Sequence, residues 1–417
     1  ENGALCFRHD VFLGEELPLT MPAGSARFWS AVYTENAFLS DHSRLMEDLR
    51  HQESFIGYGH RDFLFDLQKA TEVRGTAKIE LPPGEEAIIP IAGTAINQPL
   101  AVTTESLGTK EAYLGKWAFS FFRFSESATL HASADAPYAV GTPIRLGHSP
   151  QRRKLVLNLF VDGLSWAAAR PYAATHLPNV MRFFSRGVIF DQHFSTSEYT
   201  LPAHPAIETG YYPHHTQIFN EKAGYELPLH MTTISEQMKE QGYYCAAPLT
   251  CTNGISHGIL RGFDRLIASG WTLNSVNAVD SAIRHLKAFD ETDLFLFLLA
   301  NDVHPYDALD FKFDTAVETH MALSERIFNQ KVPAAAVRLP SLYIHQEQYL
   351  ERIRQVDRNL GQLFSYLETH FSEDEYLVNL YSDHGVSIFN NSTAAVDVIS
   401  ENSTHAAWMM RGAGIPE

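Results

Sequence analysis

Three strongly apolar runs in this chain each end in an aspartate, and this pattern limits the available folds more than any other feature. The runs are LVLNLFV before Asp162, LFLFLLAN before Asp302 and YLVNLYS before Asp383. An apolar run without polar alternation is typical of a strand that is buried on both faces of a parallel sheet. Ligands gather at the carboxyl ends of such strands, so we expect the three acids at one edge of the sheet.

The segments between these runs have the spacing of helices. Residues 177–187 and 345–371 carry apolar side chains at three- and four-residue intervals, over several turns in the second case. Strands that alternate with helices predict an α/β fold with a mostly parallel central sheet flanked by helices.

The first third of the chain has a different pattern. From residue 77 onward, short β-type runs alternate with turn sequences, which predicts an antiparallel sheet or sandwich, while residues 40–52 predict one helix. A chain of 417 residues, 45% of them apolar, is too long for one ordinary core. We therefore predict a β-rich accessory domain over residues 1–150 and a catalytic domain over residues 151–417, which we expect to be truncated at its C-terminus.

Charge and composition exclude several classes of function. The chain has 32 basic and 49 acidic residues, a net charge of −17, which repels nucleic acids and anionic lipids. No run reaches the roughly 18 apolar residues of a membrane-spanning helix. Three cysteines (Cys6, Cys245 and Cys251) argue against a disulfide scaffold and a cysteine zinc site. The given sequence starts without a signal peptide, which leans towards a cytoplasmic location.

Asp383, His384 and Gly385 follow one of the apolar runs directly. An adjacent carboxylate and imidazole at a strand end can bind one divalent cation, and the glycine lets the backbone turn. The alternative is an aspartate that caps a helix beside a surface histidine. Asp162 at a second strand end favours the metal, because two neighbouring carboxylates repel each other unless a cation lies between them.

Thr200 opens the segment TLPAHPAIETG, where a loop passes into a helix. The free amides at a helix start can stabilise a developing phosphate charge. A divalent ion beside the threonine hydroxyl could lower its pKa and make Thr200 a nucleophile. The alternative is that Thr200 only caps the helix, with Pro202 in its first turn.

Taken together, these residues resemble the alkaline phosphatase/sulfatase superfamily over roughly residues 153–417. The resemblance lies in six motifs in the right order: LFVDGL, TLPAHPAIETGYYPHH, GFDRL, NDVHPYD, YLERIRQVDRNLGQLFSYL leading into YSDHG, and NSTHAAWMMRGAGIP. The chain departs from sulfatases at two positions of their Cys/Ser-x-Pro-x-Arg segment, where it has Thr200 and His204. A threonine cannot be oxidised to formylglycine. A nucleophilic threonine instead resembles the phosphodiesterase branch and the phosphoethanolamine and lipoteichoic-acid transferase branch.

The resemblance also implies a site. One metal, Zn²⁺ or Mn²⁺, would be held by Asp162, Thr200, Asp383 and His384. A second metal or the substrate would be bound by His304, His405, Asp302 and His204. For His304 the alternative is a capped turn, and for His405 a buried structural residue.

The expected function is a metal-dependent phosphoester hydrolase or phosphotransferase that works through a phosphothreonine intermediate. Its substrate would be a small molecule or a glycan or polyol phosphate. Two alternatives remain at this point: a sulfatase-like sulfuric ester hydrolase, and a non-catalytic protein that binds glycans. The sequence does not indicate an oligomeric state.

Overall fold

The computed structural model describes residues 24–32, 64–219, 226–250, 259–269, 275–305, 313–328, 339–390 and 400–416. These residues form two compact units. The first comprises the described residues up to 152, those within 232–271 and residues 289–294, and the second comprises the others. The helix predicted over residues 40–52 lies outside the described residues. The division into domains at residue 150 remains a prediction.

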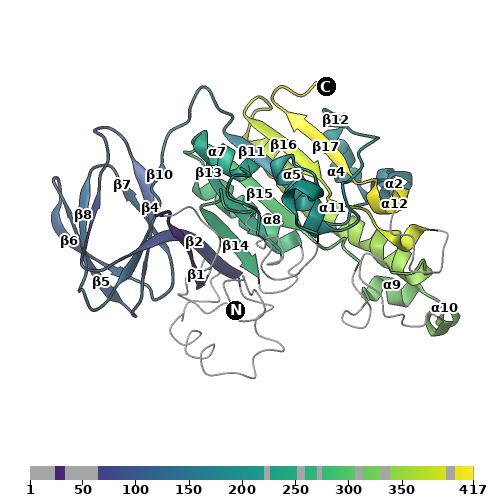
Figure 1. The fold of residues 1–417 in the computed structure, drawn as a ribbon, viewed down its shortest axis with the longest axis horizontal. Helices are drawn as coiled ribbons and strands as arrows, with labels where there is room; N and C mark the ends of the chain where they lie inside the picture. Colours follow the sequence, from purple (N-terminus) through teal and green to yellow (C-terminus); the bar gives the residue numbers. More distant parts are fainter. Residues whose placement is uncertain are drawn as a thin grey trace. The chain divides into compact units, whose positions relative to one another are not determined.

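The first unit consists almost entirely of strands (Figure 1). Its elements are β1 (Arg27–Val32), β2 (Leu64–Val73), β3 (Thr76–Ile79), β4 (Ala87–Gly93), β5 (Gln98–Thr104), β6 (Gly108–Leu114), β7 (Ser120–Phe124), β8 (Ala128–His131), β9 (Tyr138–Gly141), β10 (Ile144–Arg145), α7 (Ile234–Glu240), β13 (Tyr244–Leu249) and β14 (Arg265–Ser269). Strands β3, β8, β5 and β6 form a four-stranded sheet in that order, as the turn-separated β-type runs indicate.

Two later segments of the chain belong to this first unit. Strand β14 pairs antiparallel with β2 and parallel with β13. At this pairing the buried side chain of Arg265 binds Asp66 through two nitrogens, at 2.9 and 3.1 Å. Two-point contact of this kind gives a buried ion pair a well-defined geometry, which fixes β14 against β2.

The second unit contains the three predicted buried strands. Strands β15 (Leu294–Ala300), β11 (Leu155–Val161), β16 (Tyr376–Tyr381), β17 (Trp408–Gly412) and β12 (Val188–Ile189) lie side by side in that order. Its helices are α2 (Trp166–Ala169), η3 (Arg170–Tyr172), α3 (Ala173–His176), α4 (Pro178–Phe184), α5 (Thr200–Thr209), α6 (Pro213–Thr216), α8 (Ser275–Ala288), α9 (Thr315–His320), α10 (Leu323–Phe328), α11 (Tyr343–His370), η6 (Ser387–Phe389) and α12 (Glu401–Thr404). The predicted α/β fold class is confirmed, with a mixed sheet: β11 and β16 are parallel, whereas β17 is antiparallel to β16.

Helix α11 is the long helix that the apolar spacing predicts. Its buried positions recur at three- to four-residue intervals and include Ile353, Val356, Leu360 and Phe364. Phe364 stacks on Phe183 of α4 with ring centroids 4.1 Å apart. Asp357 of α11 accepts hydrogen bonds from the first backbone amides of α4, which begins without a side-chain cap of its own. The two helices are therefore fixed by both apolar and polar contacts.

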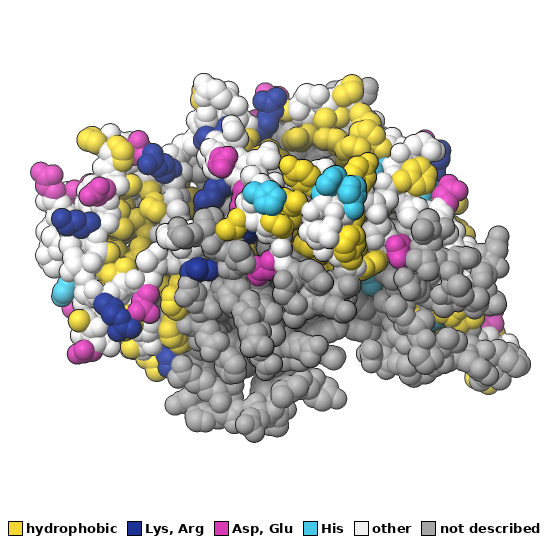
Figure 2. Space-filling view, viewed as in Figure 1, with side chains coloured by type: hydrophobic (Ala, Val, Ile, Leu, Met, Phe, Trp, Pro, Cys, Tyr) yellow, Lys and Arg dark blue, Asp and Glu magenta, His cyan; other side chains and the backbone are white. Residues whose placement is uncertain are grey.

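None of the helices described is both long and apolar enough to cross a membrane. On the face in Figure 2, lysine and arginine side chains are scattered among acidic and hydrophobic ones. Any strong attraction for an anion on this face must come from a few local groups.

Candidate active site

The register of β11 and β16 brings two of the predicted acids together. Phe160 pairs with Tyr381, so the residues that continue the strands, Asp162 and Asp383, lie at the same end of the two strands. The backbone amide of Gly163 donates to Asp383 Oδ1 at 3.3 Å. Gly163 has a φ of 75°, a conformation that glycine adopts without strain, and this turn directs its amide towards the second strand.

His384 lies at the centre of the site. Its Nε2 atom is 3.2 Å from Asp162 Oδ1, 3.4 Å from Asp383 Oδ2 and 3.3 Å from Thr200 Oγ1. Its Nδ1 atom faces the carbonyl oxygen of Gly385 at 2.7 Å, so Nδ1 carries a proton and donates it. This hydrogen bond leaves the Nε2 lone pair available for a cation, as the second partner of a metal-binding histidine commonly does.

Thr200 is the first residue of α5, and its hydroxyl does not cap the helix. The cap residue is Tyr199, whose side chain makes no capping hydrogen bond. The Thr200 hydroxyl instead lies 3.4 Å from Asp162 Oδ1 and 3.3 Å from His384 Nε2. The hydroxyl is therefore held where a carboxylate and an imidazole meet, which is the position that a nucleophile requires.

The alternative of a cap and a surface histidine at Asp383-His384 does not fit the structure, because both side chains are fully buried. Burial and the charge of Asp162 raise the pKa of Asp383 to about 6. Burial by itself would lower the pKa of His384, but the carboxylates of Asp383 and Asp162 raise it to about 9. Burial likewise opposes the ionisation of Asp162, yet His304 and His384 hold its pKa below the usual range. Buried carboxylates this close together require positive charge beside them, either a proton or a metal ion.

The donor atoms at this site fit a divalent cation. Asp162, His304 and His384 each offer a ligand atom, and these atoms lie within 4.8 Å of one another. Asp383 Oδ2 is buried and accepts no hydrogen bond from the residues described. Carboxylate oxygens combined with imidazole nitrogens suit Zn²⁺ and Mn²⁺ equally, so the donor set does not choose between them.

Of the other predicted site residues, one joins the cluster around His384 and others bind elsewhere. His304 joins the cluster, with its ring 5.6 Å from that of His384 and nearly perpendicular to it. Asp302 faces away, because both carboxylate oxygens accept from the backbone amide of Ser275, at 3.0 and 2.8 Å, at the start of α8. His405 Nε2 donates to the carbonyl oxygen of Asp191 at 2.8 Å, and the His405 ring stacks on that of Phe194.

His204 lies inside the protein, one turn after Thr200 on α5. Its side chain is 1% exposed and stacks on Phe160 and Phe297. Its Nε2 atom is 3.6 Å from Glu208 Oε1. Neither His204 nor His405 is among the residues that the structure brings together around His384.

Sequence reasoning missed the residues that hold the site in place. Tyr349 of α11 donates to the carbonyl oxygen of Gly163 and accepts from the amide of Ser165, both at 2.9 Å. Ser382 accepts from the amide of Leu164 at 2.8 Å and donates to the carbonyl oxygen of His384 at 2.9 Å. Ser382 could have been noticed from its place between an apolar strand and the Asp-His pair. Tyr349 gives no signal beyond helical spacing.

Comparison with known proteins agrees with this geometry. A model of the sulfatase family matches residues 154–408, which is more than half of the chain. The chain belongs to the sulfatase family. It is thus a hydrolase of the alkaline phosphatase/sulfatase superfamily, whose members generally bind a divalent metal, and the cluster of Asp162, His304 and His384 is a candidate for that metal. No curated protein sequence matches the chain.

Several solved structures are similar to this one. They include a phosphonate monoester hydrolase of Agrobacterium radiobacter (16% identity, 63% of this chain and 68% of that one, TM-score 0.47). A Vibrio parahaemolyticus protein of the alkaline phosphatase superfamily is 17% identical over 65% of this chain and 62% of its own, with a TM-score of 0.45. A Bacteroides thetaiotaomicron structure reported with the metabolism of glycosaminoglycans is 14% identical, over 63% and 68% of the two chains, with a TM-score of 0.46.

Proposed function

We propose that this sulfatase-family hydrolase cleaves phosphoesters with Thr200 as its nucleophile. The observation that carries the proposal is the position of the Thr200 hydroxyl, 3.4 Å from Asp162 Oδ1 and 3.3 Å from His384 Nε2. Threonine has no route to formylglycine, the group with which sulfatases attack sulfate esters. An unmodified hydroxyl at this position favours phosphorus as the electrophile. The convergence of the predicted residues also disfavours a non-catalytic glycan-binding protein.

In the proposed reaction, each of these residues has a separate role. Asp162 accepts the proton of the Thr200 hydroxyl, and Thr200 Oγ1 forms a bond to phosphorus while the bond to the leaving oxygen breaks. Water then attacks the phosphothreonine and the bond to Oγ1 breaks, while Asp162 returns its proton to Oγ1. The hydroxyl of the water stays on phosphorus, and its other proton goes to the oxygen that left in the first step. His304, which lies in the same cluster, would donate a hydrogen bond to the phosphoryl oxygens. A divalent ion held by Asp162, Asp383 and His384 would lower the pKa of the hydroxyl and offset the charge on those oxygens.

The charges of these residues favour a substrate with one negative charge. Asp162 and Asp383 together balance a divalent ion, which leaves no surplus positive charge among the residues described around His384. A phosphodiester carries one negative charge, whereas a phosphomonoester carries up to two, and each additional charge requires compensation in a buried site. We therefore propose diesters of glycans, polyols or small molecules as the substrate class, with water as the acceptor.

The test is a comparison of three esters. Wild-type protein supplied with Zn²⁺ or Mn²⁺ should hydrolyse bis-p-nitrophenyl phosphate faster than p-nitrophenyl phosphate, and both faster than p-nitrophenyl sulfate. Thr200→Ala should lose at least about 1,000-fold in kcat, and Thr200→Ser should keep most of it. Intact-protein mass spectrometry after an acid quench should detect a phosphoryl adduct on Thr200. Faster turnover of the sulfate ester, or full activity in Thr200→Ala, would overturn the proposal.

A further inference from the structure

Helix α5 carries a second pair of polar side chains, below the nucleophile and away from solvent. His204 and Glu208 are both 1% exposed, and they lie one turn apart on the helix. Their closest atoms, His204 Nε2 and Glu208 Oε1, are 3.6 Å apart, which is an ion-pair contact and too long for a hydrogen bond. Among the residues described, neither ring nitrogen of His204 nor Glu208 Oε2 has a hydrogen-bond partner. Buried polar groups of this kind require an explanation.

Aromatic side chains enclose this pair. The His204 ring stacks on Phe160 at 4.8 Å and on Phe297 at 5.5 Å between centroids. The hydroxyl of Tyr381 lies 3.5 Å from Glu208 Oε1. Burial, followed by the charges of Glu208 and Asp383, holds the pKa of Tyr381 well above its usual value, so this hydroxyl keeps its proton and faces Glu208 as a donor.

The spacing of these residues relates them to the active site. Phe160 and Tyr381 pair across β11 and β16 near the ends of these strands, and Asp162 and Asp383 follow each of them two residues later, in the turns after the strands. Along a helix, residues four apart share a face, so His204 lies below Thr200. The two repeats have nearly the same length, about 6 Å for four helical residues and about 6.6 Å for two strand residues. One layer of contacts therefore holds the nucleophile and acids, and the next holds His204 and the aromatic rings.

We propose that His204 and Glu208, with the Tyr381 hydroxyl, fix the register of α5 along β11 and β16 and thereby hold the Thr200 hydroxyl against Asp162 and His384. Both are positioning residues, since neither is placed at the reacting atoms. A shift of the helix would move Glu208 away from the Tyr381 hydroxyl and leave its buried carboxylate without this hydrogen-bond donor, a penalty that apolar packing does not impose. The inference rests on the proposed role of Thr200, but the register itself can be measured without turnover.

The experiment compares Glu208→Gln with the double variant His204→Phe/Glu208→Leu. The double variant keeps an aromatic ring between Phe160 and Phe297 and replaces the buried carboxylate with a side chain of similar volume, so it decides the question even where Glu208→Gln is not folded. Hydrogen exchange followed by mass spectrometry measures the protection of the α5 amides, which residues 203, 204 and 206–209 carry beyond the first turn. Phe183→Leu serves as the control, because Phe183 is buried in α4 and packs on Phe364, away from α5.

The expected result is at least about tenfold faster exchange in α5 for both variants, with unchanged exchange in α11. With bis-p-nitrophenyl phosphate, kcat should fall by about 100-fold while KM changes little, even though the double variant melts at or above the wild-type temperature. Phe183→Leu should lower the melting temperature and leave α5 exchange and kcat as they are. Wild-type α5 protection in the folded double variant would overturn the inference. Absence of turnover in the wild type would refute the proposed function instead and leave the exchange result to stand.

Discussion

At the scale of single residues, the position of Asp162 depends on a side chain from a distant helix. The turn that follows Asp162 contains a backbone carbonyl at Gly163 and an amide at Ser165, and both are bound by the hydroxyl of Tyr349. This hydroxyl is buried, and burial holds its pKa above the usual range, so it remains a donor to the carbonyl. The geometry of the proposed metal site therefore rests partly on α11.

Replacing Tyr349 with phenylalanine should weaken both the fold and metal binding. The change removes two buried hydrogen bonds and leaves the Gly163 carbonyl and the Ser165 amide bonded only to each other, at 3.0 Å, which costs about 1–3 kcal/mol in the free energy of unfolding. Because the turn then loses its anchor, the affinity for Zn²⁺ or Mn²⁺ should fall about 10- to 100-fold, as for other groups that orient metal ligands. Urea unfolding and isothermal titration calorimetry measure the two effects.

Tyr343 provides the control on the same helix. Its side chain is 52% exposed, so Tyr343→Phe should change stability by no more than about 0.5 kcal/mol and leave metal affinity unchanged. Equal behaviour of Tyr343→Phe and Tyr349→Phe would contradict the proposed role of the turn.

Lys69 should give the stability of the chain a particular pH dependence. The side chain is buried in β2, donates to the carbonyl oxygen of Arg261, and burial together with Lys239 lowers its pKa from 10.5 to about 8. Between these two pH values the unfolded chain binds a proton that the folded chain does not, so stability rises with pH across this window. Between pH 8 and 10.5, the free energy of unfolding of the wild-type protein should rise by roughly 3 kcal/mol relative to that of Lys69→Met. If the free energies of unfolding of the two proteins, measured by urea unfolding, differ by the same amount at every pH in this range, the prediction is wrong.

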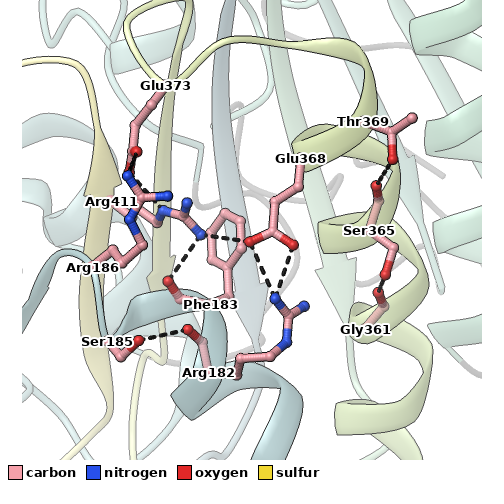
Figure 3. Close-up of polar contacts among 10 residues, drawn as sticks. All are labelled: Arg182, Phe183, Ser185, Arg186, Gly361, Ser365, Glu368, Thr369, Glu373 and Arg411. Carbon is pink, nitrogen blue, oxygen red and sulfur yellow. Dashed lines mark hydrogen bonds and ion pairs between the residues drawn. The ribbon is translucent and has the colours of Figure 1, made fainter.

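At the scale of elements, a buried arginine connects strand β17 to two helices (Figure 3). Arg411 donates to the carbonyl oxygen of Phe183 at 3.1 Å, to Glu368 at 2.9 Å and to Glu373 at 2.8 Å. Its guanidinium also lies 4.3 Å from the centre of the Phe183 ring. The Nε and Nη1 atoms of this side chain thus connect β17 to α4, to the end of α11 and to the segment that follows it.

Arg411→Gln should destabilise the protein by about 3–5 kcal/mol, because it leaves two carboxylates without their buried partner. Arg182→Gln is the matched control. Arg182 also binds Glu368, at 2.9 Å, but its side chain is 51% exposed, so its loss should cost about 1 kcal/mol or less. Chemical unfolding of the two variants compares them directly, and a similar loss in both would show that burial does not decide the strength of this network.

Which elements could be predicted depends on how each is buried. Strands β11, β15 and β16 have mostly buried residues in sequence, so a continuous apolar run identifies them. Strand β17 alternates buried and partly buried residues and contains an arginine. Its sequence therefore does not predict a buried strand and is recognised only as part of the motif NSTHAAWMMRGAGIP. Strand β12 has only two residues, which pair with β17, so no pattern of several residues marks it in the sequence.

The same limit applies to the candidate site. Asp162, Thr200, Asp383 and His384 could be predicted, because a strand end or helix start fixes where each one lies. Asp302 also follows an apolar strand, but the start of α8 lies beside it and takes both of its oxygens, which no local pattern indicates. The partner that a polar side chain meets across the fold decides its role, and that partner is distant in sequence.

At the scale of the whole molecule, the net charge of −17 opposes the approach of an anionic substrate. The proposed phosphodiester must therefore be attracted at short range, by the cation and imidazoles of the site. Salt shortens the range of the repulsion, since the Debye length falls from about 30 Å at 0.01 M to about 8 Å at 0.15 M ionic strength. Short-range contacts inside a buried site are much less affected.

Raising the ionic strength over this range should therefore increase kcat/KM for bis-p-nitrophenyl phosphate by about 2- to 10-fold and leave kcat unchanged. Parallel series in sodium chloride and potassium glutamate separate screening from competition by chloride, because only screening affects both series equally. A fall of kcat/KM with salt in both series would mean that a local positive field around the site outweighs the charge of the whole chain. In that case the substrate would be steered towards Thr200 from long range.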